Sequence, residues 1–122
     1  MKCVGLDLGT TKAAGLLLET GRSDRPGRVL RVVSRDHQAG LPPDRPWENL
    51  QDPQRLLALA RAMLAELTDA SGPPDGLCVT GQMHGILYVD SAGRAVSPLY
   101  SWLDQRAGQP HPEGGSFAEV LS

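Results

Sequence analysis

The sequence predicts an α/β fold that begins with an antiparallel meander. Three short apolar runs, at residues 3–8, 13–19 and 28–35, are separated by turn-rich segments, which is typical of strands joined by hairpins. One segment with the apolar spacing of a helix follows them, and a further short apolar run occupies residues 77–80. This order favours a helix packed on a mixed sheet.

The helix is expected over residues 53–69. Asp52 can cap it and Pro53 suits its first turn, and the Pro- and Gly-rich stretch 39–49 before it is expected to be irregular. One buried face is predicted by the apolar positions 56, 57, 60, 63, 64 and 67. Beyond residues 71–76, which end the helix, strands are expected at 85–90 and 95–99, joined by a turn at 90–94.

Composition describes one soluble globular domain. The chain has 122 residues and a formal charge of −2, which is enough length to bury a core. No apolar run approaches the length of a membrane span. Cys3 and Cys78 form neither a disulfide framework nor a metal motif, so a reduced, cytoplasmic protein is expected. Five arginines between residues 22 and 35 are interpreted as a solvated strand edge rather than a nucleic-acid surface.

The first candidate site is the segment 7–12, Asp-Leu-Gly-Thr-Thr-Lys. Asp7 interrupts an apolar strand, where an unpaired carboxylate is costly to bury. Gly9 allows a ligand to approach the backbone, and Thr10 and Thr11 offer hydroxyl and amide donors. This set suits phosphate oxygens, with Asp7 placed to hold a hydrated Mg²⁺. The alternative is an ordinary hairpin turn with a solvated aspartate.

The second candidate site is Gly-Gln-Met-His-Gly at 81–85. Gln82, Met83 and His84 follow a strand and could recognise the hydroxyls of a polyol, because unmatched buried polar groups are costly. The alternative is a tight turn with one incidental histidine. A zinc site is not expected, since no third ligand stands at metal spacing from His84 and Cys78.

The third candidate site lies within residues 100–106. Trp102, Asp104 and Arg106 could form a stacking wall with a charged clamp for hydroxyls. The alternative is a core tryptophan beside a surface ion pair. Further on, Ser116 and Glu119 have the spacing of a capping box, so residues 107–122 are expected to be a loop followed by the start of a helix, truncated by the end of the chain.

Taken together and in this order, the three motifs resemble the N-terminal domain of the FGGY carbohydrate kinases. The resemblance covers residues 3–106 and includes residues 47–53, Trp-Glu-Asn-Leu-Gln-Asp-Pro. The first motif alone also resembles Hsp70 and actin-like ATPases, whereas Gln-Met-His-Gly with the downstream Trp-x-Asp-x-Arg is more specific. Within the family it is similar to the ketose kinases, with residues 98–106 closer to sedoheptulokinase than to xylulokinase.

The resemblance implies a ribonuclease-H-like fold of the actin/hexokinase type and transfer of the γ-phosphoryl group of ATP, with Mg²⁺, to a sugar hydroxyl. Asp7 would lie near the metal, held through water, and Gly9, Thr10 and Thr11 would form the first phosphate loop. The sugar site would be lined by Gln82, Met83, His84, Trp102 and Asp104.

The family's catalytic aspartate has no counterpart in these residues, so no catalytic base is assigned and Asp104 is not given that role. Lys12 follows the threonine pair directly, whereas relatives often carry a basic residue a few positions later. Lys12 is therefore left out of the phosphate contacts. We expect residues 1–122 to form part of a ketose kinase, inactive alone, with sugar and ATP as partners and an undetermined oligomeric state. The alternative is a non-enzymatic domain that binds a sugar or a partner protein.

Overall fold

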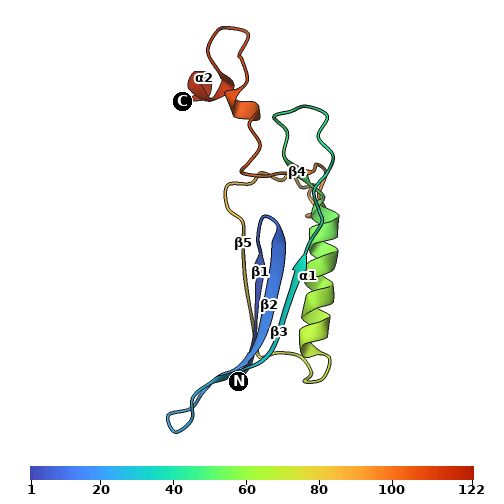
Figure 1. Cartoon of the computed structure of the whole chain (residues 1–122), viewed down its shortest axis with the longest axis vertical. Coiled ribbons are helices and arrows are strands. Elements are labelled where there is room, and N and C mark those ends of the chain that lie inside the picture. Colours follow the sequence, from blue (N-terminus) through green and yellow to red (C-terminus); the bar gives the residue numbers. More distant parts are fainter. The chain divides into compact units, whose positions relative to one another are not determined.

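The computed structural model describes all 122 residues, and their contacts group them into two compact units. The first unit comprises residues 1–38 and 54–82, and the second comprises residues 39–53 and 83–122. Figure 1 shows the elements in chain order. No helix has the length and apolar character needed to cross a membrane.

A four-stranded sheet and one long helix build the first unit. The strands are β1 (Lys2–Leu8), β2 (Lys12–Glu19), β3 (Arg28–Asp36) and β5 (Gly76–Gly81), in the order β3-β2-β1-β5. Both β2 pairings are antiparallel, and β5 runs parallel to β1. The expected meander and mixed sheet are confirmed. The crossover through a helix explains the single parallel pair, because parallel neighbours need a long connection.

Helix α1 (Pro53–Thr68) covers one face of this sheet. Side chains alternate between the faces of a strand, so every second residue of β1 and β2 packs against the helix. The buried cluster consists of Val4, Leu6, Ala13, Leu17, Val33, Met63 and Leu67. One predicted core position is wrong. Leu57 is 45% exposed, and Leu59 packs against the cluster instead, because the face of α1 that contacts the sheet is rotated about the helix axis relative to the predicted face.

Gly15 lets the helix approach the sheet. A Cβ atom at Gly15 would lie 2.8 Å from Cδ2 of Leu6 and 2.9 Å from Cδ1 of Leu67. Both distances are shorter than real carbon contacts allow. Position 15 of β2 must therefore lack a side chain for α1 to pack this closely against the sheet.

The arginines of β3 lie on an edge strand, as expected, but two of them bind the helix. Arg31 and Arg35 form ion pairs with the carboxylate of Glu66 on α1, at 3.1 and 2.6 Å. These bonds lower the pKa of Glu66, with the hydrogen bond from Arg35 as the largest cause. Strand β3 is therefore exposed to solvent and is also bound to α1 by these two ion pairs.

The second unit contains only short elements. They are β4 (Leu50–Gln51), β6 (Leu99–Tyr100), the 3₁₀ turn η1 (Arg106–Gly108) and α2 (Phe117–Leu121), with β4 antiparallel to β6. The predicted capping box is confirmed: Ser116 Oγ accepts from the Glu119 amide, and the Glu119 carboxylate accepts from the Ser116 amide. Strand β4 follows the irregular stretch and was not predicted.

The strands expected at 85–90 and 95–99 are wrong as continuous strands. Only isolated bridges form, between Ile86 and Tyr100 and between Val89 and Ala95. The predicted turn between them is present, with Asp90 Oδ1 accepting the amides of Ala92 and Arg94. The ladder is interrupted because the Tyr88 amide donates to Ser97 Oγ instead of a carbonyl, and Pro98 has no N–H to contribute.

Candidate functional site

In the first unit, the candidate residues gather where the parallel strands β1 and β5 end. Ligands of α/β sheets bind outside the carboxyl ends of parallel strands. The Gln82 amide donates to the Leu8 carbonyl at 2.9 Å, which fixes the end of β5 beside the loop of residues 9–11. A Cβ atom at Gly81 would lie 3.0 Å from the same carbonyl oxygen. The structure thus brings Gln82 next to the predicted phosphate loop.

The loop of residues 9–11 is closed by its own backbone. The Gly9 amide donates to the Lys12 carbonyl at 2.9 Å, and a Cβ atom on Gly9 would lie 3.0 Å from that oxygen. Glycine is therefore favoured at this position by close approach within the turn. Because its N–H is used there, the Gly9 amide is not available to a phosphate.

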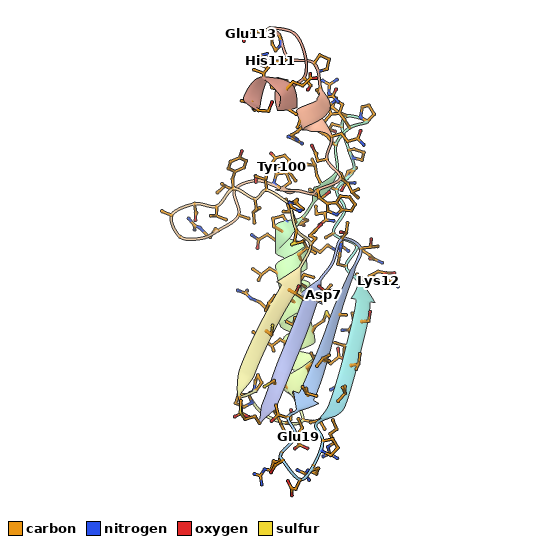
Figure 2. The ribbon with its side chains drawn as sticks, turned by 90° about the vertical axis from the view of Figure 1, so that its left-hand side faces the viewer. Asp7, Lys12, Glu19, Tyr100, His111 and Glu113 are labelled. Atoms are coloured by element: carbon orange, nitrogen blue, oxygen red, sulfur yellow. The ribbon has the colours of Figure 1, made fainter.

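Asp7 is exposed on the face of the sheet that α1 leaves uncovered. It stands opposite Ala14 on β2 and Thr80 on β5. Figure 2 looks onto this face, with α1 behind the strands and Asp7 near the end of β1. Asp7 and Thr80 contribute to a depression of about 240 Å³ that Gly5, Ala14, Leu16 and Val32 also line. An exposed carboxylate at a strand end is free to bind a hydrated cation.

Lys12 points toward the neighbouring strand. Its ammonium group lies 4.0 Å from the carboxylate of Asp36, and both side chains are exposed. Such a surface pair contributes little to stability. The contact is compatible with leaving the ammonium group of Lys12 out of the phosphate site.

His37 is a residue of this loop environment that the sequence analysis missed. It is 6% exposed, and its Nε2 atom lies 2.7 Å from the Thr10 carbonyl oxygen. Its backbone amide donates to the Thr11 carbonyl at 3.2 Å. No local sequence pattern indicates this role of His37, because the contact joins residues that lie 27 positions apart.

In the second unit, two candidate segments flank the bridge between Ile86 and Tyr100. His84 lies two residues before Ile86, and Trp102 lies two residues after Tyr100. Met83 is 72% exposed and Trp102 is 54% exposed, so Trp102 is not a core tryptophan. His84 has a backbone φ of 61°, which is uncommon for a residue with a side chain and recurs at ligand sites.

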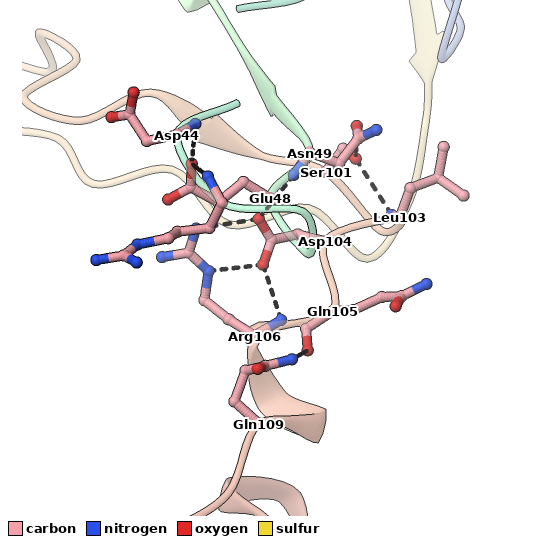
Figure 3. A network of polar contacts seen from close by, with 10 residues as sticks. Asp44, Glu48, Asn49, Ser101, Leu103, Asp104, Gln105, Arg106 and Gln109 are labelled. Carbon is pink, nitrogen blue, oxygen red and sulfur yellow. Dashed lines mark hydrogen bonds and ion pairs between the residues drawn. The ribbon is translucent and has the colours of Figure 1, made fainter. Parts of the chain in front are cut away.

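The carboxylate side chain of Asp104 accepts four hydrogen bonds within the second unit (Figure 3). It is 4% exposed. One oxygen accepts from Nε and from the backbone amide of Arg106, at 2.6 and 3.1 Å. The other accepts from Nη2 of Arg106 and from the Asn49 amide, both at 3.0 Å. Four donors fill the acceptor capacity of a carboxylate, so this is not the surface ion pair considered from the sequence.

The guanidinium of Arg106 is held on its other side by aromatic rings. Its Cζ atom lies 4.1 Å from the centre of the Tyr100 ring and 5.5 Å from that of Trp47. Such contacts attract a cation to the ring face. Ser101, also buried, donates from its hydroxyl to Asn49 Oδ1 at 2.5 Å. The segment 100–106 is therefore tied to residues 47–49.

This network makes the stability of the second unit depend on pH. The hydrogen bond from Arg106 lowers the pKa of Asp104 from 3.8 to about 2, against the opposing effect of burial. The folded state therefore binds this proton less readily than the unfolded state. We expect about 1–2 kcal/mol of stability above pH 4, lost as the pH falls through 2. Acid titration of the Asp104 carboxyl by NMR would measure this, and a midpoint near 4 would contradict it.

The described geometry assigns the candidates to the two units separately. Asp7, Gly9, Thr10, Thr11 and Gln82 meet at one edge of the first unit. The second unit holds Met83, His84, Trp102 and Asp104. No group of three metal-binding side chains is present, so any cation at Asp7 would take its remaining ligands from phosphate and water.

Comparison with known proteins finds xylulose kinases among the relatives of this chain. No family model matches the chain. It is 26% identical over 110 residues to the xylulose kinase of Lactococcus lactis and 30% identical over 109 residues to that of Escherichia coli K12. Each match covers 87% of this chain and 21% of the relative. The chain thus spans about a fifth of the length of the curated relatives that it matches.

A solved structure extends the similarity to the fold. The crystal structure of xylulose kinase from Rhodospirillum rubrum matches with a TM-score of 0.72 and 33% sequence identity, covering 88% of this chain and 22% of that one. This structure and that of a xylulose kinase from Brucella ovis are sugar kinases of the actin/hexokinase type. The predicted fold class is therefore confirmed.

Proposed function

This chain is homologous to the xylulose kinases, which are FGGY carbohydrate kinases, and we propose that it supplies the first phosphate loop and part of the sugar site of an ATP-dependent ketose kinase. The proposal is supported chiefly by the arrangement of residues at one edge of the first unit. There an exposed carboxylate, a glycine turn and two threonines lie where β1 ends, beside Gln82 at the end of β5.

The residues at this edge fit ATP and Mg²⁺. A magnesium ion keeps several waters and uses one or two carboxylates with substrate phosphates, which matches the single carboxylate of Asp7. The hydroxyl and amide donors of Thr10 and Thr11 would orient phosphate oxygens, and bound Mg²⁺ would neutralise charge on the transferred phosphoryl group. Phosphoryl transfer depends mainly on such positioning and charge neutralisation.

In the second unit, the sugar would be recognised by polar and stacking groups on the segments 83–84 and 100–104. His84 offers a donor and an acceptor for hydroxyl groups, and Met83 and Trp102 offer exposed apolar surface. We assign Asp104 a positioning role in this site, because its carboxylate is already occupied by Arg106 and Asn49. It would hold the segment that carries Trp102.

Two ketoses are candidates, and no catalytic base is assigned within these residues. The names of the relatives favour xylulose, whereas residues 98–106 resemble sedoheptulokinase. The base that accepts the proton of the attacking hydroxyl is expected in a part of the family with no counterpart here. We therefore expect the 122-residue chain to bind ligands without transferring phosphate.

Substitution of Asp7 tests the proposal. We expect the wild-type chain to bind MgADP with NMR shifts at Asp7, Thr10 and Thr11, and Asp7→Asn to weaken binding about tenfold because a metal-linked carboxylate is lost. Asp24→Asn, on an exposed turn, is the matched control. Equal affinities for both variants would contradict the proposal, and ketose binding without MgADP binding would favour a non-enzymatic sugar-binding domain.

A further inference from the structure

His37 ties the predicted phosphate loop to the end of the edge strand β3. Its ring is buried, and the acceptor that it meets is the backbone carbonyl of Thr10, 2.7 Å from Nε2. A carbonyl can only accept, so Nε2 carries the proton and donates it. The backbone amide of the same residue donates to the next carbonyl, that of Thr11, at 3.2 Å. One residue therefore holds two consecutive carbonyls of the loop.

These two bonds also fix where the loop's amides point. A trans peptide is planar, with its C=O and N–H directed to opposite sides, and the chain has no cis peptide bond. Since the Thr10 carbonyl faces His37, the Thr11 N–H faces away from it. The Thr11 carbonyl faces His37 as well, so the Lys12 N–H also faces away. His37 thereby presents two amides on the opposite side of the loop.

The end of β3 and the turn that follows it place His37 next to the loop. His37 extends the pairing of β3 by one residue beyond Asp36, which stands opposite Lys12 in the sheet. The chain then turns at Gln38, a residue with a side chain whose φ is 50°. Left-handed backbone at such a residue is maintained only where surrounding contacts hold it. The turn directs the chain away from β3 directly after the contact with the loop.

We propose that His37 is a positioning residue that holds the amides of Thr11 and Lys12 in place for a phosphate group of the nucleotide. This inference rests on the proposed phosphate role of the loop. Preorganised amides bind an anion without the loss of loop freedom that a mobile turn would incur on binding. The imidazole touches neither nucleotide nor sugar and acts only through the loop.

The test compares wild type, His37→Ala and His37→Gln in the full chain, with His111→Ala as the matched control. His111 lies in the second unit, where its ring packs on Phe117. For His37→Ala we expect NMR order parameters of the Thr11 and Lys12 amides to fall from about 0.85 to below about 0.6. The amides of Leu6 and Leu17 should stay rigid. Glutamine can donate to the Thr10 carbonyl and should restore part of the order.

Affinity for MgADP provides the second readout. We expect His37→Ala to weaken binding about five- to tenfold, with His111→Ala equal to wild type. Unchanged order at Thr11 and Lys12, or equal loosening of Leu6 and Leu17, would overturn the inference. If His37→Ala does not fold, the scalar coupling across the hydrogen bond from His37 Nε2 to the Thr10 carbonyl is measured in the wild-type chain instead. Absence of this coupling would overturn the inference. Failure of wild type to bind MgADP would instead overturn the proposed function, while the order parameters still report on His37.

Discussion

Gly15→Val is expected to destabilise the first unit by about 3 kcal/mol. The new Cβ would lie 2.8 Å from Leu6 and 2.9 Å from Leu67, and 3.4 Å from Cγ2 of Val33. All three neighbours belong to the buried cluster between sheet and helix. Because these side chains are buried, they can move aside only by repacking the cluster. Urea unfolding followed by far-UV circular dichroism measures the change, because the sheet and α1 dominate that signal.

Gly5→Ala is the matched control on the neighbouring strand. A Cβ at Gly5 would meet only Leu16, at 3.8 Å, which is ordinary contact distance. It should leave the free energy of unfolding unchanged or slightly higher, since alanine reduces the freedom of the unfolded chain. Equal stability of the two variants would show that α1 does not approach the sheet at Gly15 as described.

Arg106→Met is expected to destabilise the second unit by about 2–3 kcal/mol, because it leaves the carboxylate of Asp104 buried without its cation. Methionine preserves much of the chain length and its contact with Tyr100 while removing the charge. The pKa of Asp104, held at about 2 chiefly by Arg106, should rise. Trp47 and Trp102 both lie in the second unit, so tryptophan fluorescence during urea unfolding reports on this unit.

Arg94→Met provides the comparison for an exposed pair. Arg94 binds Asp90 at 2.7 Å, nearly the same distance as Arg106 to Asp104, but its side chain is 78% exposed. Surface pairs contribute little, so stability should hardly change. Equal losses in the two variants would contradict a special role for the buried carboxylate.

The sequence predicted those parts of the fold that depend on local patterns. The hairpin of β1 and β2, the extent of α1 and the capping box at Ser116 follow from apolar spacing and short-range hydrogen bonds, and each is confirmed. Leu57 was misplaced because apolar spacing defines the centre of a helix face only approximately, and the face that packs on the sheet includes Leu59 in place of Leu57. The continuous strands at 85–90 and 95–99 were wrong because Ser97 takes the amide of Tyr88.

The sequence predicted which residues belong to the candidate site but not which contacts they make. Asp7 and the threonine pair could be identified because a carboxylate and a glycine turn interrupt an apolar strand. The pairing of Asp104 with Arg106 could be considered from the sequence because the two residues are close along the chain. The bond from the Asn49 amide could not be foreseen, since Asn49 lies 55 positions away. His37 was missed for the same reason: its contact with Thr10 arises from the register between β2 and β3, which no local pattern determines.

An NMR titration of the chain with xylulose and with sedoheptulose shows whether the second unit binds a ketose. We expect saturable shifts of the Met83 methyl group, the His84 ring and the Trp102 indole, with weaker binding in His84→Ala and unchanged binding in His111→Ala. Signals that do not respond to either ketose, or shifts spread evenly over both units, would contradict a sugar site on these segments.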